Sequence, residues 1–316
     1  MSLCERLASE DPSIRRMALI ELADEEDEAQ LPLLAAALAG DASEDVRIEA
    51  ARLLAHWDTA EAVDALAQAL LDASSEVRAT AAHSLAELKD TRLGERLLPW
   101  ARHADAFVRG AALRALRELR LPAAAVCALE SLESGDAAVR REAVSVLGWL
   151  KHVDALPALA RLALDDHDAE VRRATVGALG MAEGAYAADV LSALLATLSD
   201  PAWPVREEAA TTLAKLRPAG AQQALRDAMD DGFWQVRLRA ARALGRLKDA
   251  AALPVLETAL SHPIANLRKE AAIALGEIAN ADARPALRAA AAADADPEVR
   301  KAARIALRAL GDEVQA

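Results

Sequence analysis

The chain repeats itself from end to end. An arginine preceded by Val, Ile or Leu recurs every 31 to 34 residues, and a leucine always follows seven residues later. The arginines are Arg15, Arg47, Arg78, Arg109, Arg140, Arg172, Arg206, Arg237, Arg268 and Arg300. A unit of this length cannot bury its own apolar face, so the repeat predicts a stacked array with no separate catalytic domain.

Composition indicates which secondary structure the units adopt. Hydrophobic residues make up 53% of the chain but aromatic residues only 3%. The apolar positions are mainly alanine and leucine, which favour helices and allow them to pack closely. The alternating β-branched pattern of strands is absent. We therefore expect an all-α fold.

Residues 154–183 show how one unit is built. Residues 156–163 predict a first helix, with Pro157 in its first turn, where a missing N–H costs little. A polar turn follows at 165–168, and a second helix begins with Asp168 placed to cap it. Each repeat is thus predicted to be a helical hairpin.

Aspartates precede the repeated arginines at two fixed distances, six residues or four residues earlier. One guanidinium could bond a turn carboxylate in its own repeat and another in the next repeat. We predict a ladder of such contacts that fixes the stacking, formed by Arg47, Arg78, Arg109, Arg140, Arg172, Arg206, Arg237, Asp41, Asp72, Asp166, Asp200 and Asp231. The alternative, a row of ligand-binding arginines, fits less well because the residue recurs in every repeat. Residues 261–266 lack the acid, so the ladder should be weakest at Arg268.

Small residues follow several of the repeated leucines and should let neighbouring helices approach closely. They include Gly148, Gly180, Gly245 and Gly276. No glycine-rich phosphate-binding segment is present. We interpret these glycines as packing positions.

The sequence Asp-Ala-Ala-Val-Arg-Arg-Glu-Ala-Val-Ser-Val-Leu-Gly at 136–148 resembles the HEAT-like repeats named after phycobilisome lyases. The resemblance covers the whole chain. It implies a right-handed α-solenoid superhelix of about ten two-helix repeats, one domain over 1–316, with capping repeats at about 1–29 and 281–316. It also implies that the second helices line the inner, concave surface. Such repeats serve scaffolds, adaptors and a few enzymes, so the resemblance is specific for fold rather than function.

Exposed positions on the second helices are the places where a partner would bind. Tryptophan and arginine are typical of binding hot spots, and few large aromatics occur elsewhere in this chain. Our candidate partner-binding residues are Phe107, Arg114, Trp149, Met181, Trp203, Trp234, Arg239, Arg242 and Arg246. Phe233 lies beside Trp234. Both a binding role and packing against neighbouring loops stay open for Trp149, Trp203 and Trp234.

Charge separates the possible partners. The net charge is −13 and both signs occur at the exposed second-helix positions, whereas nucleic acid requires a continuous positive track. We therefore expect a non-enzymatic scaffold that binds a protein or peptide. A bilin-lyase-like or other cofactor-handling subunit is the alternative, because Trp149, Trp203 and the arginines could hold an acidic tetrapyrrole. A nucleic-acid-binding protein is the third.

Motifs for other chemistry are missing. No His-Glu pair exists, so the iron hydroxylase activity known among HEAT-repeat proteins cannot be carried over. His167 among aspartates could suggest a metal site, but a capped turn explains it better. We expect no cofactor and no metal.

Location and assembly are weakly constrained. Two cysteines, no signal peptide and no apolar run of membrane length predict a cytoplasmic protein without membrane contact. The sequence leaves the oligomeric state open and is compatible with a monomer. The spacing of 34 residues before Arg206 places an insertion at Ala182–Tyr186, and a role for that loop stays open.

Overall fold

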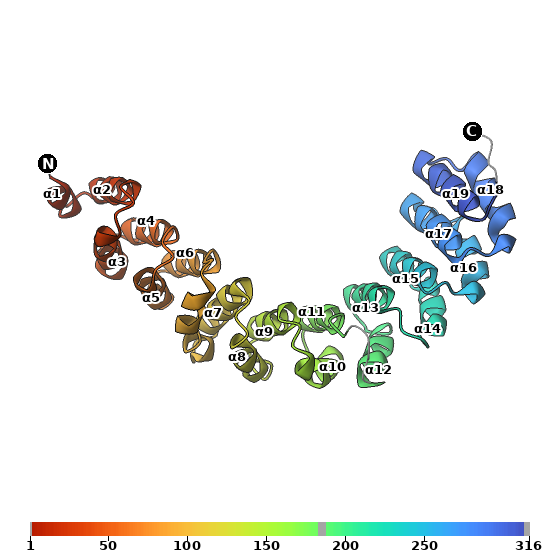
Figure 1. The fold of residues 1–316 in the computed structure, drawn as a ribbon, viewed down its shortest axis with the longest axis horizontal. Coiled ribbons are helices and arrows are strands. Elements are labelled where there is room, and N and C mark those ends of the chain that lie inside the picture. Colours follow the sequence, from red (N-terminus) through yellow and green to blue (C-terminus); the bar gives the residue numbers. More distant parts are fainter. Residues whose placement is uncertain (1, 183–187, 313–316) are drawn as a thin grey trace. The chain divides into compact units, whose positions relative to one another are not determined.

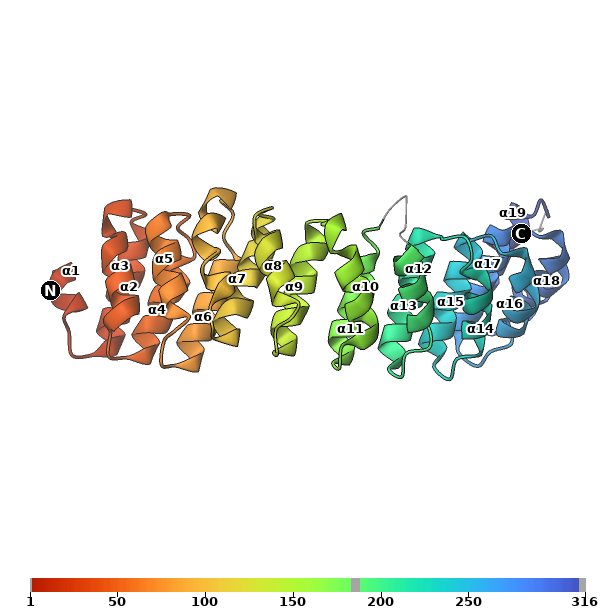
Figure 2. The same ribbon diagram turned by 90° about the horizontal axis from the view of Figure 1, so that it is seen from below.

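The computed structural model describes residues 2–182 and 188–312, and within them it contains helices and no strands. The chain divides into two units, Met1–His152 and Val153–Ala316. In each unit, helical hairpins stack side by side in chain order (Figures 1 and 2). The all-α solenoid fold predicted from the repeat is therefore confirmed. The single domain over 1–316 and its capping repeats stay predictions, and most of the loop 182–186 lies outside the described residues.

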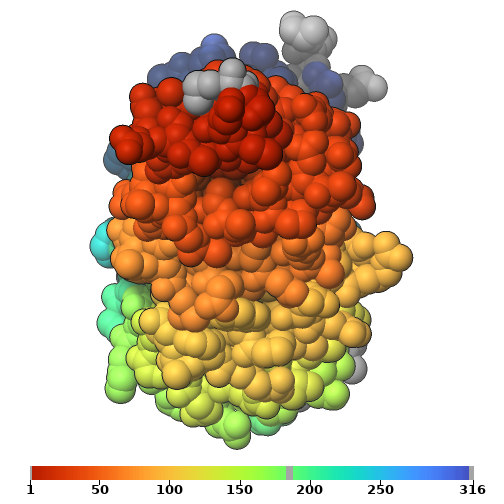
Figure 3. All heavy atoms as spheres, turned by 90° about the vertical axis from the view of Figure 1, so that its left-hand side faces the viewer, coloured from red at the N-terminus to blue at the C-terminus, as the bar shows by residue number. Residues whose placement is uncertain are grey.

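The N-terminal unit has its repeated arginines on a row of second helices. These are α2 (Pro12–Asp24), α4 (Glu44–Leu54), α6 (Ser75–Ala86), α7 (Ala106–Leu119) and α9 (Ala137–Trp149). The first helices are α1 (Leu3–Leu7), α3 (Leu31–Gly40), α5 (Ala60–Ala69) and α8 (Ala124–Ser131). Helices α1 and α2 cover the N-terminal end of the unit (Figure 3).

One first helix of this unit departs from the α-helical expectation. Before α7 the chain forms two 3₁₀ segments, Thr91–Leu97 and Trp100–Arg102. Gly94 and Pro99 lie in and between these segments, and both residue types disfavour a continuous α-helix.

The C-terminal unit has the same arrangement. Its second helices are α11 (Ala169–Leu179), α13 (Trp203–Leu216), α15 (Trp234–Arg246), α17 (Ala265–Ile278) and α19 (Pro297–Ala309). Its first helices are α10 (Leu156–Asp165), α12 (Ala188–Thr197), α14 (Gln222–Asp227), α16 (Leu253–Ala259) and α18 (Arg284–Ala293). From α13 to α19 the second helices form the inner row of this unit and the first helices the outer row (Figure 1).

Apolar packing between hairpins forms the core. The leucine seven residues after each arginine is at most 1% exposed in every repeat. Aspartates cap several second helices; Asp168, for example, accepts hydrogen bonds from the N–H groups of Glu170 and Val171. These caps satisfy backbone donors that the first helical turn leaves free.

Glycines allow the second helices of the C-terminal unit to approach closely. A Cβ atom on Gly245 of α15 would lie 2.8 Å from the Cα of Ala274 in α17, and one on Gly276 would lie 2.9 Å from the Cα of Ala306 in α19. These distances are shorter than van der Waals contact. The backbones must move apart to accept any side chain there.

We predict that Gly245→Ala destabilises the protein by about 1–3 kcal/mol, because overpacking forces α15 away from α17. Gly232→Ala is the matched control, since nothing lies within 4 Å of a Cβ at that position. Urea denaturation followed by circular dichroism measures both variants. Equal stability of the two variants would show that the close approach is not required.

Candidate partner-binding surface

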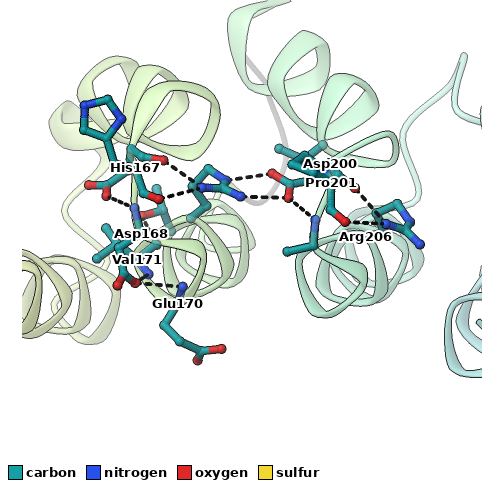
Figure 4. Close-up of polar contacts among 12 residues, drawn as sticks. His167, Asp168, Glu170, Val171, Asp200, Pro201 and Arg206 are labelled. Atoms are coloured by element: carbon teal, nitrogen blue, oxygen red, sulfur yellow. Dashed lines mark hydrogen bonds and ion pairs between the residues drawn. The ribbon is translucent and has the colours of Figure 1, made fainter.

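A single repeated arginine connects two consecutive hairpins. Nη1 of Arg172 donates to the backbone carbonyl of Asp166 in its own repeat, at 2.8 Å. Its Nε and Nη2 donate to the two carboxylate oxygens of Asp200 in the next repeat, at 2.7 and 2.9 Å (Figure 4). Asp200 also accepts the N–H of Ala202, at 2.8 Å. We call this contact between an arginine and the next repeat's aspartate a rung.

The same rung recurs in both units. Four further arginines donate from Nε and Nη2 to both oxygens of an aspartate: Arg15 to Asp41, Arg47 to Asp72, Arg206 to Asp231 and Arg268 to Asp294. The sequence interpretation differs in one detail. Within its own repeat the arginine bonds the backbone carbonyl six residues earlier, whichever residue stands there. Where that residue is a rung aspartate, its carboxylate faces the preceding arginine.

The rungs lower the pKa of their aspartates. Hydrogen bonds from Arg15 hold the pKa of Asp41 below its ordinary value. At Asp200 burial alone would raise the pKa, but the bonds from Arg172 and from the N–H of Ala202 outweigh it, so the pKa is lowered. Both aspartates are therefore held in the ionised form that the rung requires.

Two arginines of the N-terminal unit lack an aspartate in the next repeat. His103 and Ser134 occupy the equivalent positions, six residues before the following arginine. Arg78 lies over the ring of Phe107 instead, 5.8 Å from its centre, and Arg109 donates to the Ser134 hydroxyl at 2.9 Å. The rungs predicted for Arg78 and Arg109 are therefore absent, and a ring contact and a hydroxyl contact take their places.

The third broken rung lies at Arg237. His262 stands where the aspartate would be, and the buried Nε of Arg237 has no hydrogen-bond partner. His262 still accepts the N–H of Ile264 with Nδ1, at 3.0 Å, as the aspartates do for their own turns. The prediction of a weak contact at Arg268 is wrong, because Arg268 bonds forward to Asp294; the break falls one repeat earlier.

Arginines on the exposed second-helix surface form a second set of ion pairs. Arg242 donates to both oxygens of Glu270 at 2.8 and 2.7 Å. In the N-terminal unit Arg114 pairs with Glu142 at 2.9 Å. In these pairs the arginine lies five residues after a ladder arginine and the glutamate two residues after the next one. This spacing was available in the sequence, but our interpretation treated Arg114 and Arg242 as open to a partner.

Other candidate residues of the α15 surface differ in their surroundings. Arg239 pairs with Glu207 of α13 at 3.0 Å, whereas Arg246 is exposed at the end of α15. Met181 is only 7% exposed and does not lie on the predicted surface. Helix α11 ends at Leu179, so Met181 no longer follows the helical spacing from which its exposure was inferred.

Aromatic residues gather where α13 and α15 begin. The rings of Trp203 and Phe233 stack with their centres 5.5 Å apart, and Arg206 lies over Phe233 at 5.7 Å. Phe233 is 44% exposed, and Trp203 and Trp234 are half-buried. We call Trp203, Phe233 and Trp234 the aromatic cluster.

The N-terminal unit has two separate exposed aromatic residues. Trp149 is 54% exposed at the end of α9, and the guanidinium of Arg120 lies 4.9 Å from its ring centre. Phe107 is 44% exposed at the start of α7. Both rings are therefore held by an arginine on one side and open to solvent on another.

The turn around His167 shows no metal-binding geometry. Asp168 caps α11, and the backbone carbonyl of His167 accepts from Arg172 (Figure 4). Among the described residues, no group of three or more histidine, cysteine, aspartate or glutamate side chains is arranged to hold a metal ion.

Within residues 2–182 and 188–312, every helix is too short or too polar to cross a lipid bilayer.

We predict that Asp200→Asn lowers stability at pH 7 by about 2–4 kcal/mol, because Arg172 and Asp200 are only 10% and 7% exposed and the variant leaves the arginine unmatched. The folded-state pKa of Asp200 is lowered, so its contribution is complete above about pH 4 and is lost as the pH falls through that lower value.

Urea denaturation at pH 7 and at the lowest pH where both proteins fold measures this difference. The difference between wild type and variant should shrink in acid. The exposed Asp189→Asn is the control and should change little. A variant as stable as wild type at pH 7 would contradict the role of the rung.

We predict that His262→Asp completes the rung to Arg237 and stabilises the protein at pH 7 by about 1–2 kcal/mol. Burial and the charges of Arg237 and Arg268 lower the pKa of His262. The unfolded chain therefore binds the proton more readily, and wild-type stability falls as the pH drops below about 6.5.

The advantage of His262→Asp should therefore grow between pH 7 and pH 5, as measured by denaturant midpoints. His262→Asn is the matched control, because its side chain keeps the acceptor for Ile264 but carries no charge. An Asp variant no more stable than the Asn variant at pH 7 would refute the prediction.

The chain is similar to known proteins in its sequence pattern and in its fold. The HEAT-repeat sequence pattern matches residues 31–117, 94–180, 170–232 and 225–308. A crystal structure of an engineered protein is similar at 25% identity over 98% of both chains, with a TM-score of 0.57. The search of the curated proteins found no match.

Two larger proteins share the fold. Kap95p, in a structure with RanGDP, matches 98% of this chain at 15% identity with a TM-score of 0.69, over 49% of its own length. Kap121p bound to Nup53p matches 98% of this chain at 16% identity and a TM-score of 0.69, over 41% of its length. The chain thus spans half or less of these proteins. Because the HEAT-repeat pattern extends over most of its length, the chain belongs to the HEAT-repeat family.

Proposed function

We propose that the protein is a non-enzymatic scaffold that binds a protein or peptide on the second-helix surface. The observation that carries this proposal is the aromatic cluster, Trp203, Phe233 and Trp234, on helices α13 and α15. In the N-terminal unit, Trp149 and Phe107 offer further contact points of the same kind.

The aromatic cluster suits a polypeptide partner. Phe233 is 44% exposed although its ring stacks on Trp203 and has the guanidinium of Arg206 5.7 Å from its centre. A ring that is already fixed loses little conformational freedom on binding, and it offers a large apolar area to a partner side chain. Aromatic residues of this kind dominate the binding energy of protein interfaces.

The charges of the same surface disfavour nucleic acid. Arg239 and Arg242 are paired with Glu207 and Glu270, so they do not form a free positive track. Nucleic-acid binding depends on many cations that neutralise phosphates, and the chain carries a net charge of −13. A surface whose charges are already paired suits a polypeptide partner, which is recognised by its shape and by individual side chains.

Proteins of similar fold bind other proteins. Kap95p is described with RanGDP and with Nup1, and Kap121p is described bound to Nup53p. These similarities support a scaffold role for the fold without naming a partner for this chain. The bilin-handling alternative rests on the repeat type and on Trp149, Trp203 and the surface arginines, and it stays the second candidate. A cytoplasmic location without cofactor stays a prediction from the sequence.

Peptides selected from a random display library test the proposal. We expect the purified protein to enrich binding peptides, and the double substitution Trp203→Ala with Phe233→Ala to weaken them by about tenfold or more. Leu164→Ala is the control, because Leu164 is 47% exposed on a first helix of the same unit.

Circular dichroism and thermal melting of the double variant provide the check on folding. The helical signal and melting midpoint should match those of the wild type. Loss of the fold would make the two rings structural, and unchanged peptide affinity in a folded variant would remove the aromatic cluster from the binding surface.

A further inference from the structure

One glutamate of the second-helix surface lacks the arginine that its counterparts have. Four glutamates lie two residues after a ladder arginine: Glu49, Glu142, Glu208 and Glu270. Glu49 accepts from Arg16, Glu142 from Arg114 and Arg117, and Glu270 from Arg242. In the described part of the chain, Glu208 alone among the four has no hydrogen bond or ion pair.

A glycine explains the missing partner. Arg114 and Arg242 each lie five residues after a ladder arginine, and the residue at this place before Glu208 is Gly177 of α11. A Cβ on Gly177 would lie 3.1 Å from a carboxylate oxygen of Glu208 in α13. The carboxylate therefore faces the glycine across the two helices, where the repeats of Glu142 and Glu270 have an arginine side chain. Glu49 is bonded instead by Arg16, and the counterpart of Arg16 in this repeat is Arg173.

The neighbouring arginines are already occupied. Arg173 donates from Nε and Nη2 to Glu170 on its own helix, at 3.0 and 2.8 Å. Arg239 donates to Glu207 at 3.0 Å. Arg173 and Arg239 still act on Glu208 through space and lower its pKa, but neither bonds to it, and burial together with the charge of Glu207 outweighs them. Burial raises the pKa of Glu208, as expected for a carboxylate whose charge is poorly compensated.

We propose that Glu208 and Gly177 form a notch that binds an arginine side chain of the polypeptide partner. The chain itself shows the fit: in the equivalent place Arg242 donates two parallel bonds to Glu270. A guanidinium supplied from outside would make the same bidentate contact with Glu208. The notch lies on α13, which also carries Trp203 of the aromatic cluster.

This inference rests on the proposed function for its biological meaning, but its chemistry is tested separately. The probe is Nα-acetyl-arginine amide, and Nα-acetyl-citrulline amide is its neutral isostere. Carbon NMR follows the side-chain carboxyl signal of Glu208, assigned by its loss in Glu208→Gln. The arginine probe should shift this signal and lower the titration midpoint of Glu208, whereas citrulline should leave both unchanged.

Two variants test whether the response to the arginine probe depends on Glu208 and Gly177. Gly177→Arg should supply an internal partner for Glu208, lower its titration midpoint without any probe and weaken the response to the arginine probe by about tenfold or more. Glu277→Gln removes an exposed glutamate of α17 and should leave the response at wild-type strength. No shift with the arginine probe, or an equal shift with citrulline, overturns the notch.

The selected peptides separate the two proposals. If peptides bind through the aromatic cluster while the arginine probe gives no shift, the scaffold function stands and the notch is refuted. If the arginine probe binds and no peptide is enriched, the notch stands and the scaffold function fails. If both hold, replacing the arginine of a selected peptide by citrulline should cost about tenfold in wild type and little in Glu208→Gln.

Discussion

The rung between an arginine and the next repeat's aspartate holds consecutive hairpins in register. Apolar packing of alanine and leucine gives the hairpins a reason to stack but little directionality. A guanidinium that bonds its own turn through a carbonyl and the next turn through a carboxylate fixes the position of one hairpin on the other. Because Asp200 and its counterparts also accept a backbone N–H of their own loop, each rung orders the turn as well as the interface.

Ion pairs between neighbouring repeats also occur across the second-helix surface, and they change what that surface is able to bind. Ion pairs with glutamates of neighbouring helices occupy Arg114, Arg239 and Arg242. Most of the charge on this surface is therefore already neutralised within the protein. Features that remain unmatched then stand out. They are the exposed Phe233 ring of the aromatic cluster and the carboxylate of Glu208 opposite Gly177. A partner with an apolar side chain and an arginine could contact the aromatic cluster with the first and pair with Glu208 through the second.

Much of this could be predicted from one sequence, and the failures have physical reasons. The period and the buried leucine determine the hairpins, and the aspartate that stands six residues before most of the ladder arginines gives the two members of a rung. The direction of the rung was misjudged, which is why the weak contact was expected at Arg268 rather than at Arg237. Whether an arginine bonds the carboxylate of its own repeat or of the next repeat depends on how one helix is offset from the next. Sequence spacing alone does not give this offset.

Single surface residues were harder to place. Met181 was expected to be exposed because it continued the spacing of α11, but the helix ends before it. Arg242 was expected to be free because its partner, Glu270, lies 28 residues away in another helix. The special position of Glu208 follows only from comparing the same place in several repeats of the folded chain.

A double-mutant cycle on Arg172→Gln and Asp200→Asn tests the rung most directly, because it isolates the contact between two repeats from other effects of each substitution. We predict a coupling free energy of about 1–3 kcal/mol at pH 7 from urea denaturation, as expected for a nearly buried bidentate pair. The matching cycle on Arg237→Gln and His262→Asn should give a coupling near zero. A coupling below about 0.5 kcal/mol between Arg172 and Asp200 would contradict the central role of the rung.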